Sequence, residues 1–496
     1  MPQTVQINFT GGIVSPGYLK EVLNIAAAAR ITHVRFGLRQ QLLLSVLENA
    51  FTGFAQACAE KNIVFYRGSN AAPNIMSSYP AAGIFTSDTW LREGVYKDVF
   101  DAFDFVPKLK INICDSTQNF VPFYTGHINW ISSKNEQFWH LYIRFPGTQV
   151  IYRFPELIYT NDLTPLSKII EALLLAPNTF ASDTTQLYHA VRSNAAFVSR
   201  PSNDALPEAN FALPYYEGFN RHDHALWLGI YRRDEMYPLS FLTDMCDVCL
   251  QTRIGQLYTT PWKSIIIKGI DVADRRYWDG VLGTYRINVR HAANELNWQV
   301  EDGEEEGLLL KRLLIRHFDK EDVRTYGLCF AVQVRPHQGM FGSIIIRKEA
   351  VINPGKLKSL ERFEILYTKD FNPNSFQLVS FRQQVQKEFI ATYLVSVCKL
   401  FYEQQHRQLL LVKEKALLST IESVGEAVNS NTVYQCSRCF TVYEEAVGDP
   451  EAGIAPGTPF TQLSADYTCY VCGASKEVYK PVQSAIIYNS LEVAME

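Results

Sequence analysis

The chain has 496 residues, too many for one ordinary domain, so we expect two to four domains. Its formal net charge of -4 argues against a general nucleic-acid binder, because neutralising phosphates requires a basic face. No apolar run approaches the roughly 20 residues that cross a bilayer. The start, MPQTVQINFTGG, lacks the basic and apolar regions of an export signal. We therefore expect a cytoplasmic protein without a membrane span, in which the ten cysteines are reduced.

The first half of the chain predicts elements that recur in the second half. The segment GYLKEVLNIAAAARI has the apolar spacing of an amphipathic helix, and the apolar segment 33–46 that follows predicts a strand. A shift of 223 residues lays Leu19 on Leu242 and residues 42–44 on residues 265–267. A helix and a strand that recur at one fixed offset predict an internal duplication of about half the chain.

Alternating apolar segments after each copy predict further strands, separated by helical segments such as LSKIIEALLLA. The predicted strands are KLKINIC, HINWISS, WHLYIRF, TYRINVRH, TYGLCFAVQVR and GSIIIRK. Apolar positions at helical spacing, without proline, predict long helices over 377–427. The acidic segment EDGEEEG (301–307) predicts a solvated turn between strands. The fold class is α+β, with mixed sheets and helices.

Near the C-terminus, two Cys-x-x-Cys pairs, Cys436/Cys439 and Cys469/Cys472, flank a connector of 29 residues. A Cys-x-x-Cys turn lets two thiolates converge on one metal ion, with backbone N–H groups directed at the sulfurs. Two such turns complete a tetrahedral shell of four sulfurs, which suits zinc or iron. The four cysteines therefore predict a ligand set without deciding the metal.

The connector resembles that of rubredoxins. Those proteins have a Gly-Asp-Pro, a Gly-Ile-x-Pro-Gly-Thr-x-Phe run and an Asp-aromatic pair between their two Cys-x-x-Cys pairs. The matching elements are Gly448-Asp449-Pro450, Gly453 to Thr458, Phe460 and Asp466-Tyr467. The resemblance implies an aromatic core of Tyr434, Tyr443, Phe460 and Tyr467. Three positions depart from the pattern: Phe440, Tyr467 and Tyr470 stand where the family generally has Gly, Trp and Pro.

What the rubredoxin resemblance implies is one mononuclear iron held by Cys436, Cys439, Cys469 and Cys472, which cycles between ferric and ferrous. One electron enters or leaves while the tetrahedron stays nearly unchanged. The alternative is a zinc-stabilised structural domain, because cysteine spacing does not exclude the other metal.

Residues 8–370 resemble nitrite and sulfite reductases, which contain two ferredoxin-like half-domains. The segment from Arg35 to Gln41 stands where those enzymes have an Arg-x-Thr-Thr-Arg-Gln-Asn type sequence. Matching arginines in the family contact siroheme carboxylates or the oxyanion substrate, so the resemblance implies an anion or tetrapyrrole pocket at Arg35 and Arg39. We favour the other interpretation, a pair of strand-end arginines in salt bridges.

The same family couples siroheme to a [4Fe–4S] cluster held by a Cys-x5-Cys and a Cys-x3-Cys. Here NIMSSYPAAG has Ser78 or Tyr79 where a cysteine belongs, and KINICDSTQNFV has only Cys114. Because such clusters need several convergent thiolates, we expect neither the cluster nor siroheme. A further pair, Cys246 and Cys249, falls on the buried face of a predicted helix and is expected to pack there.

These patterns together predict reductase-like halves at 1–225 and 226–428 and a rubredoxin-like domain at 431–485. We expect an electron carrier rather than a complete reductase. Its iron would relay single electrons from a donor such as a flavoprotein to a nitrite or sulfite reductase docked on the scaffold. Two alternatives stay open: a siroheme-dependent nitrite or sulfite reductase with a built-in rubredoxin donor, and a zinc-containing assembly subunit.

Overall fold

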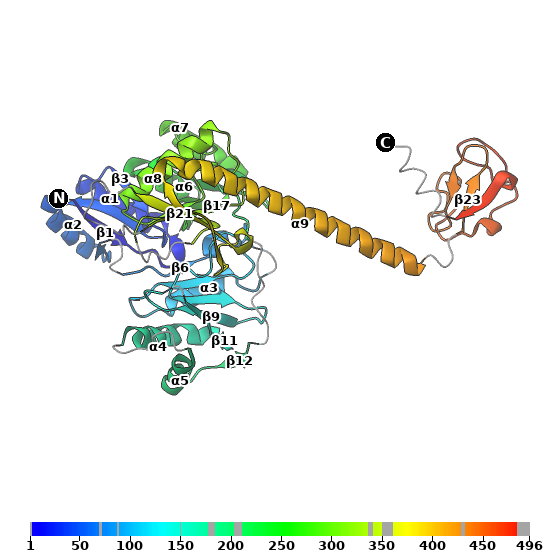
Figure 1. Cartoon of the computed structure of the whole chain (residues 1–496). Coiled ribbons are helices and arrows are strands. Elements are labelled where there is room, and N and C mark those ends of the chain that lie inside the picture. Colours follow the sequence, from blue (N-terminus) through cyan, green and yellow to red (C-terminus); the bar gives the residue numbers. More distant parts are fainter. Residues whose placement is uncertain are drawn as a thin grey trace. The chain divides into compact units, whose positions relative to one another are not determined.

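The computed structural model describes residues 2–68, 72–86, 89–148, 150–176, 184–202, 211–335, 341–349, 361–427 and 432–483. The chain forms two compact units, Met1–Phe401 and Tyr402–Glu496 (Figure 1). Among the described residues, no helix combines the length and the apolarity that a membrane span requires. The predicted domain limits at 428, 431 and 485 lie outside the described residues, and the limit between 225 and 226 stays a prediction.

The larger unit contains the same subdomain twice. The first copy comprises β1 (Pro2–Ile7), β2 (Ile13–Val14), α1 (Pro16–Ala28), β3 (His33–Phe36), β4 (Leu42–Leu47), α2 (Glu48–Glu60) and β5 (Tyr66–Arg67). The second comprises β13 (Gly218–His222), β14 (Ala225–Ile230), β15 (Tyr237–Pro238), α6 (Leu239–Gln251), β16 (Leu257–Thr259), β17 (Ile265–Ile270) and α7 (Arg275–Thr284). A shift of 223 residues lays α1 on α6 and β4 on β17 with identical bounds. The predicted duplication is therefore confirmed.

The two copies exchange short strands. The sheets run in the orders β15-β3-β4-β1-β5 and β13-β14-β17-β16-β2, so each contains one strand from the other copy. The exchange is reciprocal, since Tyr237 pairs with Val34 and Leu257 pairs with Val14. Helices α1 and α6 bury Leu19 and Leu242 in one shared hydrophobic core.

Each copy is followed by a mixed sheet, and the two sheets share one pattern of parallel and antiparallel pairing. The first sheet contains β6 (Met76–Ser77), β7 (Ile111–Cys114), β8 (Ile128–Ser132), β9 (Phe138–Arg144), β10 (Ile151–Arg153), β11 (Glu156–Tyr159) and β12 (Ser199–Pro201). The second contains β18 (Trp298–Val300), β19 (Phe330–Gln333), β20 (Ile344–Lys348), β21 (Arg362–Thr368) and β22 (Leu378–Gln386). In both, the first three strands pair in parallel and the later ones antiparallel. The predicted α+β class with mixed sheets is confirmed.

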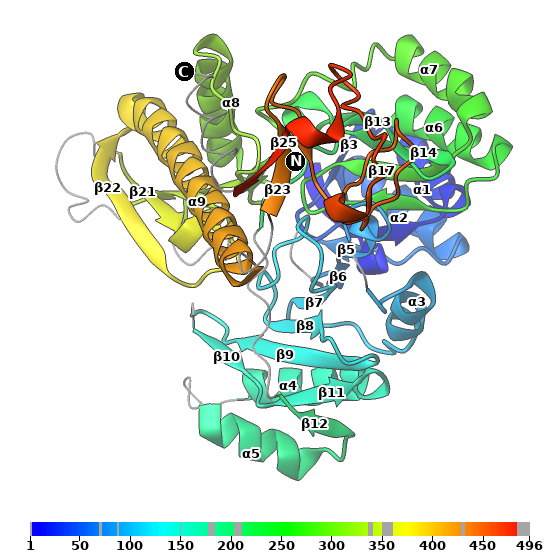
Figure 2. The same cartoon turned by 90° about the vertical axis from the view of Figure 1, so that its right-hand side faces the viewer.

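The helices of these portions are α3 (Glu93–Asp101), α4 (Leu163–Leu175), α5 (Thr184–Asn194), α8 (Glu305–Lys320) and α9 (Ile390–Ala427). Helix α4 lies against the first sheet, where Trp130 Nε1 donates a hydrogen bond of 2.9 Å to Ser167 Oγ. The start of α9 lies beside β21 and β22 (Figure 2), and Phe401 packs edge-on against Phe371.

Two secondary-structure predictions are wrong in part. The segment TYRINVRH does not form a strand: α7 ends at Thr284, and none of residues 285–291 is in a strand. The long helix begins only at Ile390, because residues 378–386 pair with β21 and form β22. Pairing with a neighbouring strand outweighs the local helical pattern there.

The acidic segment 301–307 is not a solvated turn. Glu305 and Glu306 begin α8, where negative charge is favoured by the helix dipole. The Asp302 side chain is only 6% exposed. Its carboxylate accepts hydrogen bonds from the backbone N–H of Leu38 at 3.1 Å and from Gln41 Nε2 at 3.0 Å. Asp302 therefore joins the second half of the chain to the first.

The smaller unit contains a three-stranded antiparallel sheet in the order β24 (Val442–Tyr443), β23 (Thr432–Cys436), β25 (Tyr479–Gln483). The predicted aromatic core forms beside it, and Tyr434 stacks on Phe460 with ring centroids 4.0 Å apart. Tyr479 is an additional member of this core. So small a core by itself supplies little stability.

Candidate metal centre

Two turns of the same geometry present the four cysteines. In the first, the N–H of Phe440 donates to the carbonyl of Cys436 at 2.8 Å. In the second, the N–H of Gly473 donates to the carbonyl of Cys469 at 2.7 Å. Phe440 and Gly473 have φ angles of 63° and 65°, the left-handed conformation that closes each turn. Each Cys-x-x-Cys pair is therefore held by its own backbone.

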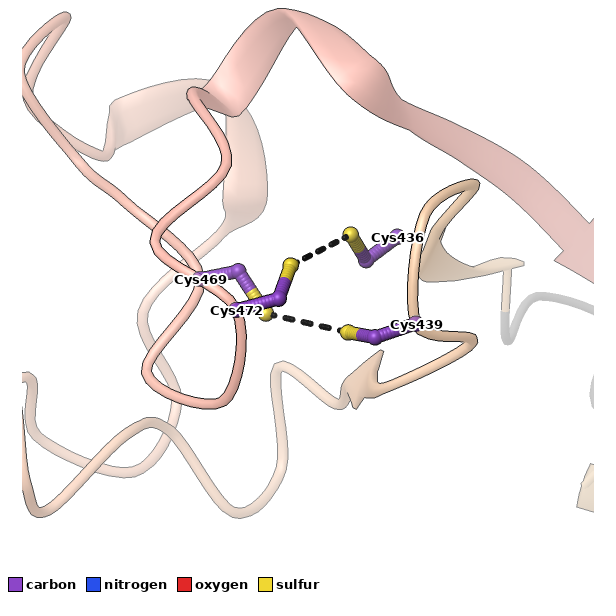
Figure 3. Close-up of side chains that lie close together, drawn as sticks. All are labelled: Cys436, Cys439, Cys469 and Cys472. Carbon is purple, nitrogen blue, oxygen red and sulfur yellow. Dashed lines mark hydrogen bonds between the residues drawn. The ribbon is translucent and has the colours of Figure 1, made fainter.

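The sulfur atoms of the two turns converge (Figure 3). Cys436 Sγ lies 3.7 Å from Cys472 Sγ, and Cys439 Sγ lies 3.5 Å from Cys469 Sγ. All four lie within 4.8 Å of one another. A tetrahedral ion with metal–sulfur bonds of about 2.3 Å needs sulfur separations of about 3.8 Å. The four thiols thus fit one ion, and no other group of three or more His, Cys, Asp or Glu side chains does so among the described residues.

The surroundings of the thiols set their proton affinities. Burial acts to raise the pKa of Cys469, but hydrogen bonding by Tyr479 and by the N–H groups of Cys472 and Val471 lowers it to about 6. A hydrogen bond with Thr441 lowers the pKa of Cys439. The N–H of Ala474 acts to lower the pKa of Cys472, but burial and the neighbouring cysteine thiols raise it to about 12. A metal ion must displace the remaining protons, so its binding depends on pH.

The Gly-Asp-Pro and Asp-aromatic elements of the connector bond to one another. Tyr467 donates its hydroxyl to Asp449 Oδ2 at 2.8 Å, and Asp449 Oδ1 accepts from the N–H groups of Glu451 and Ala452. Gly448 has a φ of 73°, and a Cβ there would lie 2.6 Å from the carbonyl oxygen of Ile454. The connector is thereby fixed between the two cysteine pairs.

One edge of the site reaches the surface. Cys439 and Cys472 are partly exposed, whereas Cys436 and Cys469 are buried. The side chains of Phe440, Tyr470 and Val471 are 69%, 53% and 59% exposed. An ion at this site would therefore lie close to the surface, with apolar side chains at its edge.

Arg35 and Arg39, predicted as a pair, have different surroundings. Arg35 Nε contacts Met236 Sδ at 2.9 Å. The guanidinium of Arg39 is buried and donates to Asn74 O (2.9 Å), Asn112 Oδ1 (3.1 Å) and Ile111 O (2.6 Å). Neither arginine forms a salt bridge with a described residue. The two guanidinium groups thus have different partners, and an anion or tetrapyrrole pocket shared by them stays a prediction.

Arg39 instead lies among cationic groups that the sequence analysis missed. Burial and neighbouring positive charges lower the pKa of Lys110 to about 8, and burial lowers that of Arg144 to about 10. The same causes lower the pKa of His127 to about 3. Lys110 Nζ has no hydrogen-bond partner among the described residues, whereas Arg144 Nε donates to the carbonyl of Gly126. The only sequence signal was the lysine-rich start of KLKINIC.

The residues that stand where nitrite and sulfite reductases have the cysteines of their iron–sulfur cluster make other contacts here. Ser78 Oγ bonds to the Tyr96 hydroxyl at 2.8 Å and accepts from the N–H of Asp115 at 2.7 Å. Cys114 and Cys329 are fully buried, and neither belongs to a group of metal-binding side chains in the described part of the chain. These donors do not fit a cluster of four thiolates. Cys246 and Cys249 are buried on α6, as predicted.

Comparisons with known proteins agree with this site. The family model described as Rubredoxin matches residues 433–479. The C-terminal unit thus carries a rubredoxin domain, a class of iron-binding electron-transfer domain, and through it the chain belongs to the rubredoxin family.

Individual rubredoxins are similar over this domain alone. The High molecular weight rubredoxin of Moorella thermoacetica is 53% identical over 49 residues, which are 10% of this chain and 21% of that protein. Rubredoxin 4 of Rhodococcus sp. (strain Q15) is 43% identical over 56 residues, 11% of this chain and 93% of that protein. The chain thus spans about a fifth of the first relative and nearly all of the second.

The larger unit has a solved structural relative. The NirA protein of Mycobacterium tuberculosis superimposes with a TM-score of 0.62 at 12% identity, covering 80% of each chain. At this identity the likeness shows the fold alone. It confirms that this part of the chain shares the fold of the NirA protein.

Proposed function

We propose that this protein is an electron carrier of the cytoplasm, in which Cys436, Cys439, Cys469 and Cys472 hold one iron ion. The convergence of the four sulfur atoms within 4.8 Å is the observation that supports this proposal. Iron bound by four thiolates supplies one-electron exchange between the ferric and ferrous states, without making or breaking a bond.

The residues around the sulfurs are arranged for such exchange. The backbone hydrogen bonds of Phe440 and Gly473 hold the two turns, so the ligands need to move little when the charge changes. The partly exposed Cys439 and Cys472 give a partner protein a short path to the ion. The exposed Phe440 and Tyr470 give the partner apolar surface to cover.

The larger unit is proposed to dock a redox partner, because its fold is of the nitrite/sulfite reductase type while its donors do not fit the cluster of that family. The partner would be a nitrite- or sulfite-reducing enzyme, and the electron donor a protein such as a flavoprotein. Mixing the full-length protein with such a reductase should give a complex and electron transfer. Finding neither would exclude this partner.

Metal analysis and a visible spectrum of the full-length protein from iron-replete cells test the central proposal. We expect one iron per chain and iron–thiolate charge-transfer bands that bleach on one-electron reduction. Zinc in a colourless protein would instead support the zinc-stabilised structural subunit.

A second candidate function is favoured by the buried cationic groups around Arg39. Lys110 Nζ has no hydrogen-bond partner among the described residues, and the positive charge of Arg144 acts on it. An oxyanion or the carboxylates of a tetrapyrrole would offset this positive charge. The protein would then be a nitrite or sulfite reductase with a built-in rubredoxin donor. Tetrapyrrole bands in the visible spectrum would support this function, and their absence would count against it.

A further inference from the structure

A side-chain hydroxyl lies against one of the ligand sulfurs. Thr441 Oγ1 is 3.0 Å from Cys439 Sγ. Thr441 lies two residues after Cys439 and is partly buried. A thiolate that binds a metal has no proton, so the hydroxyl must be the donor in this contact. The bond is therefore charge-assisted whenever the site is loaded.

A second hydroxyl, that of Tyr479, is buried in the core cluster that contains Cys469. Tyr479 is 7% exposed, and its hydroxyl oxygen is buried without a hydrogen-bond partner of ordinary geometry among the described residues. Its ring packs on Phe460 and Tyr467, with centroids 5.3 Å and 6.0 Å away. Tyr479 acts to lower the pKa of the Cys469 thiol, and burial and Cys469 raise the pKa of the Tyr479 hydroxyl. A buried hydroxyl without a partner is costly, so a thiolate beside it is the acceptor it lacks.

We infer that the hydroxyls of Thr441 and Tyr479 donate hydrogen bonds to Cys439 and Cys469 and raise the reduction potential of the bound iron. This inference rests on the proposed iron site. Cys439 Sγ and Cys469 Sγ are 3.5 Å apart, so both hydroxyls act on the same edge of the sulfur set.

The physical cause is the change in charge on reduction. One electron from a one-electron donor adds one negative charge to the iron and its four thiolates, and no bond or proton is exchanged. Hydrogen-bond donors aimed at the sulfurs stabilise the more negative reduced state more than the oxidised state. Removing a donor must therefore shift the equilibrium toward the ferric form.

Two matched hydroxyls in the same domain serve as controls. Ser437 Oγ donates to the carbonyl of Val478 at 2.7 Å, and the Tyr443 hydroxyl donates to the carbonyl of Thr458 at 2.7 Å. Both hydroxyls bond to backbone oxygen rather than to sulfur. Ser437→Ala thus removes an aliphatic hydroxyl from this domain, and Tyr443→Phe removes a phenolic one. Neither hydroxyl bonds to a cysteine sulfur.

The experiment is a redox titration of the full-length protein, followed at the charge-transfer bands, with iron per chain measured for each variant. We expect Thr441→Val and Tyr479→Phe each to shift the ferric–ferrous equilibrium roughly tenfold toward ferric, which is about 59 mV for a one-electron couple. Thr441→Ser, which keeps the hydroxyl, should retain the wild-type potential, as should both controls.

Several outcomes would overturn the inference. If the two test variants bind iron and have the potential of the controls, the hydroxyls do not tune the centre, although the proposed function stands. If the wild type binds no iron, both proposals fail together. If Thr441→Val binds no iron, the reduction potentials of Thr441→Ala and Tyr479→Phe test the inference instead. Potentials equal to those of the controls would overturn it.

Discussion

Glu235 and Lys263 form an ion pair of 2.7 Å in the interior of the larger unit, where the exposed fractions of the two side chains are 2% and 4%. Lys311 approaches the other oxygen of Glu235 at 2.9 Å. Burial acts to raise the pKa of Glu235, but the two lysines lower it to about 2. The carboxylate thus joins the second subdomain copy to α8.

Replacing Glu235 should destabilise the larger unit. We expect Glu235→Gln to lower the free energy of unfolding by about 3–5 kcal/mol, because buried Lys311 loses its counter-charge and buried Lys263 keeps only its pair with Asp302. Glu21→Gln is the matched control: its pair with Lys61 is about half exposed, so its loss should cost less than about 1 kcal/mol. Chemical denaturation of both variants compares the two costs, and equal costs would show that the buried pair has no special role.

The contribution of Glu235 should also make the free energy of unfolding depend on pH. The folded-state pKa of Glu235, about 2, is lower than the usual value of 4.5. The stabilisation of the folded state by the Glu235 carboxylate is therefore complete above pH 4.5 and is lost as the pH falls toward 2. Denaturation at several pH values should show this loss in the wild type and a smaller one in Glu235→Gln. The same slope in both proteins would assign the acid sensitivity to other groups.

Phe440 occupies a backbone conformation that suits glycine. Its φ is 63°, and its side chain is 69% exposed, so little packing offsets the strain. We expect Phe440→Gly to stabilise the rubredoxin domain by about 1 kcal/mol, since strain of about 1–2 kcal/mol is relieved and glycine costs some chain entropy. Gly473→Ala, at φ 65° in the second turn, should act in the opposite direction. The temperature at which the charge-transfer bands disappear measures both, and a lower value for Phe440→Gly would contradict this account.

Removing one ligand should abolish the metal centre. Cys436→Ser is expected to lose bound iron and to unfold the small domain, because metal binding contributes to its folding. Cys246→Ala removes a thiol that is buried on α6, outside the site, and should keep the full iron content. Metal analysis of both full-length variants checks this. Retention of iron by Cys436→Ser would mean that three thiolates suffice.

Anion binding near Lys110 should weaken as the pH rises above about 8. Burial and neighbouring cations lower the pKa of this ammonium to about 8, so its positive charge is lost above that value. The affinity for nitrite, whose own charge stays constant in this range, should fall by up to about tenfold per pH unit above pH 8. Calorimetric titration of the wild type measures this, and Lys110→Met should bind weakly at every pH. The exposed Lys134→Met is the control. A pH-independent affinity would place the anion elsewhere.

Much of the site could be predicted because its information is local. The spacing of Cys436 and Cys439, and of Cys469 and Cys472, lies within single turns whose backbone hydrogen bonds direct both sulfurs one way. The glycine of the connector, Gly448, marks a turn that no larger residue can form. The duplication was visible because a fixed offset between like patterns survives sequence divergence.

Other features could not be predicted, since they depend on partners that are distant in the chain. The burial of Asp302 follows from its bond to Leu38. The strand β22 exists because β21 lies beside it. The local sequence predicted a solvated turn at residues 301–307 and a helix at residues 378–386. Neither segment contains the partner, Leu38 or β21, that it contacts in the fold.

By itself, the sequence determined the two cysteine pairs that are the candidate metal ligands, the rubredoxin-type connector and the duplicated scaffold, because each depends on spacing along the chain. Only the tertiary structure decided which groups surround those ligands and the arginines. Tyr479 joins the core cluster that contains Cys469, and Lys110 comes within electrostatic reach of Arg39, through the packing of separate segments. Burial and charge act through space, so their effects emerge only when the chain has folded.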